Sequence, residues 1–171
     1  MIRPVQAWAR NARVRFFLPQ LHSGDRILEI GPGDGWFKKA LAGSMRVDYV
    51  TIDVNAPADV RGDVREWRQC GLKPQSFDAI VAFEVVEHTP CFRECHDLLK
   101  SGGHLLITTP MPRFDSLLRM FENLHLTQKR TSEHTNLVSV KTVPGFILEK
   151  VRYPFGLGQW AVLRKVEPGW D

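Results

Sequence analysis

Short apolar runs recur along the chain and are separated by segments rich in glycine, proline and charged residues. Runs of about four to eight apolar residues are typical of buried strands, whereas apolar residues spaced three and four apart are typical of helices. The pattern predicts strands at residues 26–30, 47–53, 58–61, 77–83, 104–108, 146–153 and 159–166. It predicts helical segments at residues 34–43, 64–70, 91–100, 114–126 and 139–143. Residues 101–103, Ser-Gly-Gly, are expected to stop the helix at 91–100.

Residues 1–22 carry a mixed pattern of apolar and arginine positions that predicts one more helix. Apolar Val5, Trp8, Ala12 and Phe16 recur at helical spacing, so one side of the helix can pack against the protein. Pro19 ends the pattern, because proline cannot continue a helix.

Strands and helices alternate up to residue 108, and the strands are apolar on both faces. This order predicts an α/β fold, a doubly wound parallel sheet with helices on both sides. The last two strands are joined only by the turn PFGLG and its neighbours, which favours an antiparallel hairpin at one edge. We expect residues 1–171 to form a single domain, because no repeat or change in composition marks a linker.

The composition narrows the class of protein. A hydrophobic content of 43% with 25% charged residues is typical of a globular protein rather than a disordered one. No apolar run approaches the roughly 18 residues of a membrane span, and the first ten residues do not resemble a signal peptide. The three cysteines, Cys70, Cys91 and Cys95, cannot all pair within one chain, so we expect a reducing cytoplasm.

The chain carries a net charge of +4 and has a pI of about 9.1. Such a surplus can attract nucleic acid, a membrane surface or acidic substrates. The sequence has no basic run of five or more residues and no aromatic motif of the RNA-binding type, so nucleic acid is not the favoured partner.

Residues 27–37 read ILEIGPGDGWF, a strand that breaks into glycines at every second position. Gly31 and Gly33 allow a tight turn and a close approach of the backbone to a ligand, and exposed N–H groups at the following helix start favour a polar ligand. The carboxylates of Glu29 and Asp34 disfavour a polyphosphate. They suit a ligand with positive charge and hydroxyl groups.

Polar residues also follow the next strands of the predicted sheet, where ligands of such sheets bind. Asp53 ends the second strand, and a carboxylate there can accept hydrogen bonds from both ribose hydroxyls. Asp63 follows the third strand, and EVVEH follows the fourth. The glycine pattern is G-x-G-x-G rather than the dinucleotide fingerprint G-x-G-x-x-G, so a nicotinamide cofactor is disfavoured.

In chain order, the motifs are ILEIGPGDGWF, VDYVTIDVN, RGDV, FDAIVAFEVVEHT and LLKSGGHLLITTPMP. This set resembles the class I S-adenosylmethionine-dependent methyltransferases, and most closely the methyltransferase type 11 branch that includes quinone O-methyltransferases. The resemblance covers residues 24–166, the core of the expected domain, and leaves residues 1–22 as an N-terminal helix or lid. It implies a Rossmann-like sheet of order 3-2-1-4-5-7-6 with strand seven antiparallel.

The resemblance implies S-adenosyl-L-methionine as the cofactor and assigns residues to its methionyl part. Gly31, Pro32 and Gly33 would approach it, and Glu29 would help to hold its amino group. The backbone around Phe83 would reach the same amine.

For the adenosine part, the resemblance implies that Asp53 holds the ribose hydroxyls and that Val54 packs against the adenine. Asp63 would accept from the adenine amino group, with the N–H of Val64 nearby. Asp63 has a second interpretation, because a carboxylate at this place is also a common helix N-cap.

His88 lies just beyond the fourth strand, on the side where the cofactor is expected. If the acceptor is a hydroxyl, His88 is the candidate general base, because an imidazole accepts protons near neutral pH. The alternative is that His88 orients the loop before Pro90.

Glu84, Glu87 and His88, with His134 from the loop before strand six, offer ligands for a divalent metal ion, as in some relatives of the family. The alternative is that Glu84 and Glu87 begin a helix, where carboxylates are favoured. Metal dependence is therefore an open hypothesis.

The sequence departs from the family pattern in two places. Residues 53–63 are too few for the usual helix between strands two and three, and the acceptor-binding segments, residues 1–22 and 110–143, are small. An open acceptor site suits a large substrate, a second copy of the chain or a partner protein. Apolar residues at helical spacing would line such a surface or belong to the core; they are Trp8, Phe16, Phe17, Phe114, Met120 and Phe121.

The sequence predicts an enzyme that transfers a methyl group, with O-methylation ahead of N- or C-methylation. It does not identify the acceptor. Two alternatives stay open, a cofactor-binding regulatory subunit without chemistry of its own and an RNA methyltransferase.

Overall fold

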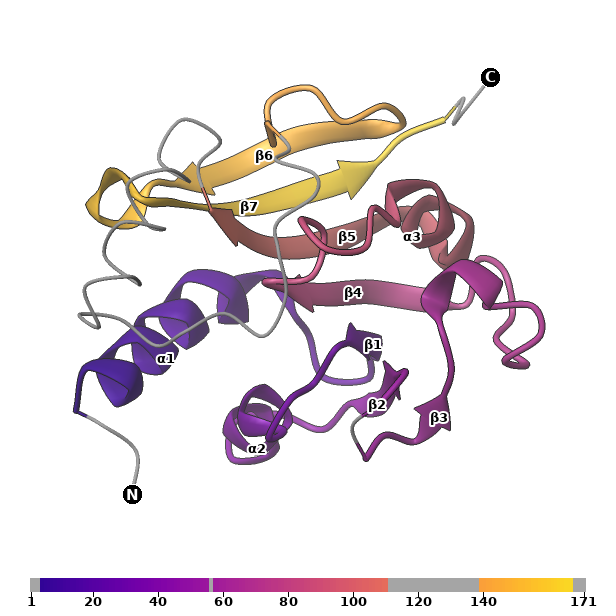
Figure 1. Cartoon of the computed structure of the whole chain (residues 1–171), viewed down its shortest axis with the longest axis horizontal. Coiled ribbons are helices and arrows are strands. Elements are labelled where there is room, and N and C mark those ends of the chain that lie inside the picture. The colour runs from indigo at the N-terminus through magenta and orange to yellow at the C-terminus, as the bar shows by residue number, and fades with distance from the viewer. Residues whose placement is uncertain (1–3, 56, 111–138, 168–171) are drawn as a thin grey trace.

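The computed structural model describes residues 4–55, 57–110 and 139–167 (Figure 1). In these residues seven strands form one sheet in the order β3-β2-β1-β4-β5-β7-β6. The strands are β1 (Arg26–Ile30), β2 (Asp48–Asp53), β3 (Val60–Arg61), β4 (Phe77–Phe83), β5 (Leu99–Pro110), β6 (Phe146–Arg152) and β7 (Gly158–Lys165). β7 pairs antiparallel with both β5 and β6, whereas the pairs from β3 to β5 are parallel. The predicted strand order and the antiparallel strand seven are confirmed.

Helices lie on both faces of the sheet, as predicted (Figure 1). They are α1 (Pro4–Phe17), α2 (Trp36–Ala42) and α3 (Phe92–Leu98), with single 3-10 turns η1 (Leu18–Gln20), η2 (Val64–Glu66) and η4 (Pro154–Gly156). Phe17 of α1 and Phe37 of α2 share one apolar cluster with Ile27 of β1. Leu28, the next residue of β1, belongs to the cluster of α3 on the other face.

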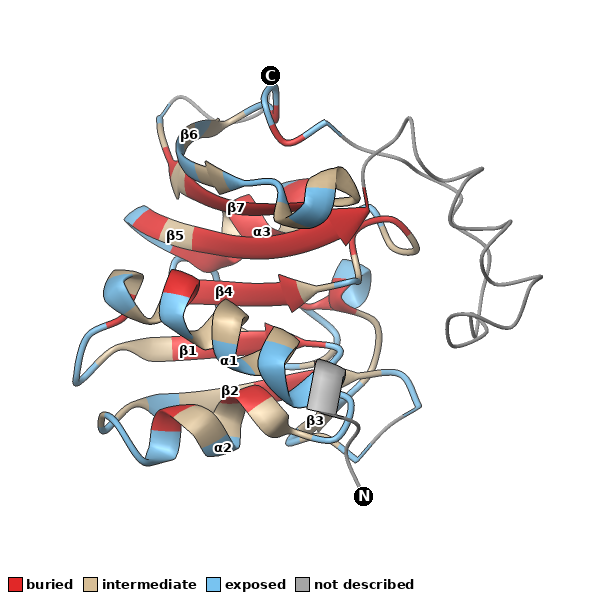
Figure 2. Ribbon diagram, turned by 90° about the vertical axis from the view of Figure 1, so that its left-hand side faces the viewer, coloured by how far each residue is buried: buried red, intermediate tan, exposed pale blue. Residues whose placement is uncertain are grey.

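The central strands are buried on both faces, which explains why they read as continuous apolar runs (Figure 2). In β4, Ala79 and Val81 face the α1–α2 cluster, and Ile80 faces the α3 cluster. Each such buried aliphatic side chain contributes about 2 kcal/mol to the folded state. The carboxyl ends of β1, β2, β3 and β4 consequently meet at one firmly held edge.

The first helix after the glycine turn begins later than predicted. The sequence placed its start at Asp34, but α2 begins at Trp36, after Gly35 as its N-cap. Gly35 has φ of 67°, a left-handed conformation that cannot belong to the helix itself.

Strand five is longer than predicted, and the preceding helix is shorter. α3 ends at Leu98, and β5 begins at Leu99, which pairs with Phe77 of β4. The residues 101–103 that were expected to stop the helix instead lie in the strand where its register with β4 shifts. Gly102 has φ of 73°, and a side chain on Gly103 would come within 3.0 Å of the Asp78 carbonyl.

The helix predicted at residues 139–143 is absent, and a turn occupies this place. The Lys141 N–H contacts the Ser139 hydroxyl, and Pro144 disfavours helical backbone at the residue before it. The helix predicted at 114–126 lies outside the described residues.

Between β2 and β3 the described residues contain no helix, as the short segment predicted. None of the helices in the described ranges is long and apolar enough to cross a bilayer. α1 packs against the core by Phe16 and Phe17, which are buried, whereas Trp8 is 53% exposed. Phe114, Met120 and Phe121 lie outside the described residues.

Candidate functional site

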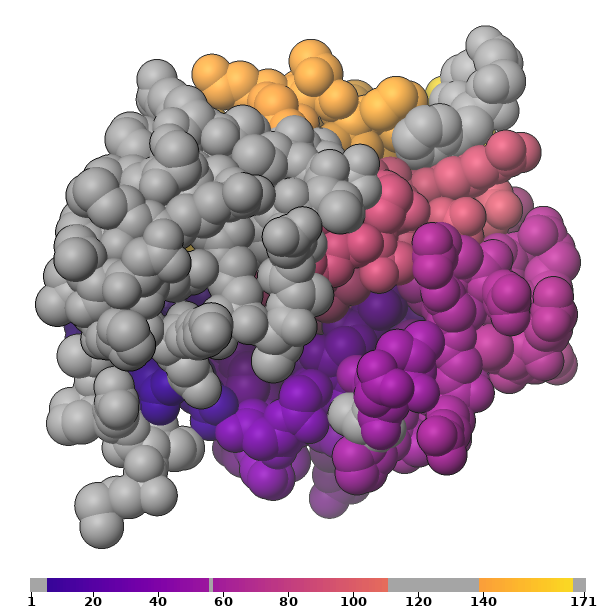
Figure 3. Space-filling view, viewed as in Figure 1, coloured from indigo at the N-terminus to yellow at the C-terminus, as the bar shows by residue number. Residues whose placement is uncertain are grey.

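A cavity of about 220 Å³ lies where the carboxyl ends of β1, β2 and β3 meet the residues that follow β4. It is lined by Ile30, Gly31, Ile52, Asp53, Val54, Gly62, Asp63, Val64, Arg65, Val85 and Thr89. Figure 3 shows the residues after β2 and those after β3, in purple and magenta, next to one another on one face. Five of the predicted cofactor-binding residues are therefore brought together: Gly31, Asp53, Val54, Asp63 and Val64.

Gly31 forms the floor of the turn after β1. Its N–H donates to the Ile52 carbonyl at 3.0 Å, and its φ is 67°. A Cβ at this residue would come within 3.0 Å of Cγ2 of Val85. Glycine is required for both reasons, the left-handed backbone and the close approach of two segments.

Asp53 is the last residue of β2, and its carboxylate is oriented by its own turn. Oδ1 of Asp53 accepts from the Asn55 N–H at 2.7 Å, and the Asp53 carbonyl accepts from the Gly62 N–H at 3.0 Å. Val54 follows with 49% of its surface exposed. A carboxylate beside an exposed apolar side chain matches the needs of a ribose and the flat ring attached to it.

Asp63 is the N-cap of η2, so the second interpretation of this residue is confirmed. Its carboxylate accepts from the Arg65 N–H at 2.9 Å and from the Arg65 guanidinium. The hydrogen bond from the Arg65 side chain lowers the pKa of Asp63, which keeps the carboxylate ionised. Capping does not remove Asp63 from the cavity, and its role toward adenine stays a prediction.

A second hollow of about 510 Å³ lies on the other side of the glycine turn, beside α2. Its lining residues are Pro32, Gly33, Asp34, Gly35, Lys38, Thr51, Pro57, Ala58 and Asp59. Pro32 and Gly33 thus line a different hollow from Gly31. The Asp34 carboxylate there forms an ion pair of 2.7 Å with Arg10 of α1.

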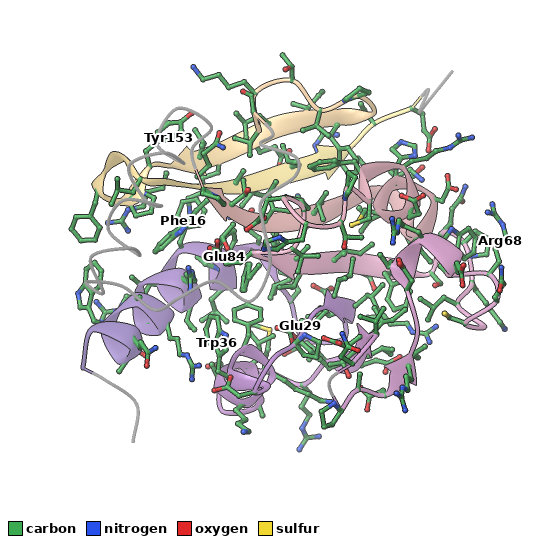
Figure 4. All side chains as sticks on the ribbon, in the orientation of Figure 1. Phe16, Glu29, Trp36, Arg68, Glu84 and Tyr153 are labelled. Carbon is green, nitrogen blue, oxygen red and sulfur yellow. The ribbon has the colours of Figure 1, made fainter. Side chains whose placement is uncertain are left out.

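Glu29 is buried in β1, with 3% of its surface exposed, and lines neither hollow. Burial raises the pKa of Glu29 to about 7, partly opposed by Tyr49 and Lys38. Figure 4 shows Glu29 near the start of α2 in projection. Its predicted contact with the cofactor amino group stays a prediction.

Phe83 ends β4 beneath the helices α1 and α2. Its ring lies 4.9 Å from that of Phe17, 5.0 Å from that of Phe37 and 5.9 Å from that of Trp36, between ring centres. The Phe83 side chain therefore packs in the core, and only its backbone remains available for the predicted contact.

Glu84 connects the end of β4 to two other elements (Figure 4). Its φ is 56°, unusual for a residue other than glycine. One carboxylate oxygen accepts from Thr108 of β5 at 2.8 Å and from Arg13 of α1 at 3.0 Å. Sequence reasoning missed Arg13 and Thr108, because nothing in the spacing of an arginine in a helix identifies its distant partner.

The predicted metal ligands are not assembled in the part of the chain that the structure describes, where no group of three or more candidate ligands could hold an ion. Glu84 is directed to Arg13 and Thr108, and Glu87 is fully buried. Burial, and then the nearby Glu84 charge, raise the pKa of Glu87 to about 8. His134 lies outside the described residues.

His88 lies in the turn after β4, with its N–H donating to the Val85 carbonyl at 2.9 Å. Val85 and Thr89, on either side of it, line the 220 Å³ cavity. The structure therefore brings the segment of His88 to the 220 Å³ cavity. The predicted role of its imidazole as a base stays a prediction.

Comparisons with known proteins agree on one family. A family described as a methyltransferase domain matches residues 5–143. A ubiquinone biosynthesis O-methyltransferase from Xanthomonas campestris pv. campestris is 31% identical over 104 residues, 50% of this chain and 43% of the relative. The mitochondrial protein of that name from Rattus norvegicus is 33% identical over 107 residues, 51% of this chain and 31% of the relative. The chain thus spans less than half the length of these curated relatives.

Known structures share the fold at low identity. A putative methyltransferase from Haloferax volcanii, in complex with the Trm112 methyltransferase activator, has a TM-score of 0.65 and 12% identity, covering 97% of each chain. Magnesium protoporphyrin IX methyltransferase from Synechocystis PCC 6803, with bound SAH, has a TM-score of 0.62 and 14% identity, covering 97% of this chain and 89% of the other.

Proposed function

The chain belongs to the class I S-adenosylmethionine-dependent methyltransferases, and we propose that it transfers a methyl group from this cofactor to a hydroxyl oxygen of its acceptor. The observation that carries the proposal is the 220 Å³ cavity, where Gly31, Asp53, Asp63 and their neighbours converge from the ends of different strands. Residues distant in sequence meet there, and their carboxylates and apolar side chains are groups that suit an adenosine.

The residues present fit the cofactor. The bare backbone of Gly31 lets Val85, from the segment after β4, pack against the turn, so that both residues line the cavity. Asp53 provides a carboxylate for the ribose hydroxyls, and Val54 an exposed apolar surface for the adenine. The ionised Asp63 and the Val64 N–H are suited to the polar edge of the same ring.

When bound, the cofactor would supply an electrophilic methyl group: an in-line acceptor oxygen would bond to the methyl carbon as the carbon–sulfur bond breaks, and the sulfur would leave as a neutral thioether. The protein must hold donor and acceptor in line and exclude water, which accounts for much of the rate enhancement. His88 takes the hydroxyl proton as the oxygen attacks. Phe83, packed between α1 and α2, fixes the end of β4 from which the His88 segment continues.

For the acceptor we infer a phenolic hydroxyl. The curated relatives are named ubiquinone biosynthesis O-methyltransferases, and the matched region is about half of this chain. A phenol loses its proton more easily than an aliphatic alcohol, so a single imidazole base is sufficient.

A second candidate function is a methyltransferase subunit that requires a partner protein. The hollow of about 510 Å³ beside α2 favours it, because the described residues between β2 and β3 form no helix to cover this side. The related Haloferax volcanii structure is a complex with an activator. Methyl transfer by the purified chain alone would reject this candidate.

Isothermal titration with S-adenosylhomocysteine, the demethylated cofactor, tests the proposal. We expect Asp53→Asn to bind it roughly tenfold to a hundredfold more weakly, because a hydrogen bond to a charged group contributes about 1.5–3 kcal/mol. Asp48→Asn, at the other end of β2 and 63% exposed in its side chain, is the matched control and should bind like the wild type. Equal affinity of all three proteins, or no binding by any, would reject the proposed site.

A further inference from the structure

Two aromatic side chains stand exposed in contact with each other at one end of the molecule. Trp8 of α1 is 53% exposed, Phe155 of η4 is 80% exposed, and their ring centres lie 5.6 Å apart. η4 follows β6, which ends at the same edge of the sheet as the parallel strands. The pair therefore lies at the edge of the sheet where the parallel strands end, the edge that holds the 220 Å³ cavity; Figure 2 shows α1 on the side turned toward the viewer.

Phe155 is held in a strained backbone conformation with φ of 52° and ψ of 15°. A bulky residue in this left-handed region costs about 1–3 kcal/mol. Its side chain gains little burial in return, since four-fifths of it faces solvent. Strained and exposed aromatic residues of this kind are characteristic of surfaces that bind something.

Cationic side chains lie on α1, which carries Trp8, and on β6, which leads into η4 and Phe155. Arg15 lies two helical turns from Trp8 on the same side of α1, and Lys150 and Arg152 alternate along β6. Lys150 lies over the ring of Phe16 and Arg152 over that of Trp160, so both face the cluster beneath α1. Among the described residues, none of the three forms an ion pair.

The surroundings contain little negative charge to offset these cations. The α1 sequence PVQAWARNARVRFF has no acidic residue. Glu149, the acid of β6, is already paired with His104 and Arg164. The strip formed by Trp8, Arg15, Lys150, Arg152 and Phe155, which we call the α1–β6 strip, is therefore both apolar and positively charged.

We propose that the α1–β6 strip docks the protein on a bilayer surface that contains anionic lipids. Exposed aromatic rings insert at the level of the headgroups, and neighbouring cations attract the anionic lipids. Trp8 and Phe155 line neither of the two hollows described above, so the strip presents itself to a broad surface rather than to a small ligand. Single-stranded RNA fits less well, because the two rings pack on each other at 44° rather than standing apart as separate platforms for successive bases.

Docking at this edge would place the cofactor side of the sheet toward the bilayer, where an amphiphilic acceptor could be taken up directly. The docking itself does not depend on methyl transfer. It is measured without cofactor or acceptor, so it can fail or succeed separately from the proposed function.

Cosedimentation of the whole chain with vesicles tests the proposal. The wild type should bind vesicles made of phosphatidylglycerol and phosphatidylcholine, and this binding should weaken as salt is added. It should bind vesicles of pure phosphatidylcholine poorly. Lys150→Gln with Arg152→Gln should lower the partition coefficient about fivefold per cation. Trp8→Ala with Phe155→Ala should lower it by about tenfold or more.

Two matched controls lie at the opposite edge of the sheet. Arg46→Gln removes an exposed cation just before β2, and Ile147→Ala removes a 48% exposed apolar side chain near the start of β6. Both should bind vesicles like the wild type, and circular dichroism should show that every variant is folded. Equal losses in controls and strip variants, or no preference for anionic vesicles, would overturn the proposal. So would tight binding of polyuridylate by the strip without vesicle binding, or a wild-type dimer that the Trp8 and Phe155 changes dissociate.

Discussion

The edge of the sheet where we propose that the cofactor binds, called the cofactor edge below, and the helix α1 beside it are held in place by partly different forces. At the cofactor edge, main-chain hydrogen bonds join each turn to the neighbouring strand: Gly31 to Ile52, Gly62 to Asp53 and Glu84 to Thr108. Near the same edge, α1 reaches these turns through charged side chains, by the ion pairs Arg10–Asp34 and Arg13–Glu84. The cofactor edge is fixed by backbone and core. In α1, the buried Phe16 and Phe17 anchor the C-terminal end in the core, whereas the preceding turns are held by pairs that are partly exposed.

The difference suggests how the two parts of the site work. Main-chain hydrogen bonds have a fixed geometry, and losing one leaves a backbone group without its partner, which is costly wherever water cannot replace that partner. Partly exposed ion pairs contribute at most about 1 kcal/mol and weaken in salt. We infer that the cofactor edge is preorganised, whereas the turns of α1 that precede Phe16 can shift at low cost and so admit acceptors of different size.

The largest expected effect comes from His88, whose substitution should change catalysis without changing cofactor binding. We expect His88→Gln to lower kcat by about a hundredfold or more, since general bases contribute about 10²–10⁴ in rate. Its affinity for S-adenosylhomocysteine should stay within about twofold of the wild type, because the described cavity is lined by Val85 and Thr89 rather than by His88. Initial rates with a panel of phenols, together with titration calorimetry, measure both quantities.

The exposed His22, with 75% of its side chain accessible, offers the control His22→Gln, which should change neither quantity. If His88→Gln keeps its kcat, His88 is not the base. If the variant instead loses affinity for S-adenosylhomocysteine, His88 belongs to the cofactor edge rather than to the acceptor side of the site.

The next effect concerns Glu29, a buried acid within the preorganised edge. Its pKa is about 7 in the folded protein against 4.5 unfolded, because burial disfavours the charge. An acid with a raised pKa destabilises the fold progressively as the pH rises from 4.5 to about 7, and by its full amount above. Glu29→Gln should therefore raise the free energy of unfolding by up to about 3 kcal/mol at pH 8, with no gain at pH 4.

Urea unfolding across this pH range checks the result. In Glu29→Gln, the fall of the free energy of unfolding with rising pH should become less steep but should not disappear, because burial also raises the pKa of Glu87. The exposed Glu66 supplies the control Glu66→Gln, which should leave the slope unchanged. A variant that gains stability and loses affinity for S-adenosylhomocysteine would show that Glu29 holds the cofactor amino group. A variant without any gain would show that Glu29 is not a buried charge.

The sequence predicted the cofactor edge better than it predicted the side of α1, for a physical reason. Asp53 and Asp63 each end or follow a strand, and parallel strands bring such positions together without further information. Glu84 and Arg13 lie 71 residues apart, and their contact depends on how α1 packs on the sheet. No local pattern encodes that packing.

The secondary-structure elements that were predicted wrongly also depend on contacts between residues far apart in the sequence. Ser101, Gly102 and Gly103 look like a helix stop in sequence, but pairing of Leu99 with Phe77 places them in a strand. Apolar Val140 and Val143 are spaced like one face of a helix, yet the segment that carries them forms a turn, and both side chains are buried in the core. In each case a tertiary contact overrides the local preference, and only the complete sheet shows it.

The smallest expected effect tests how strongly the ion pairs hold α1 against the turns of the cofactor edge. A double-mutant cycle of Arg13→Gln and Glu84→Gln should give a coupling energy of about 0.5–1 kcal/mol, because the two side chains are 23% and 48% exposed. The same cycle for Arg10 and Asp34, at 26% and 57%, should give a similar value, and both should fall when urea unfolding is repeated at high salt. Coupling above about 3 kcal/mol, unchanged by salt, would mean that α1 is as firmly built in as the strands. The acceptor side would then be rigid too, and its selectivity would have to come from shape rather than from adjustment of the helix.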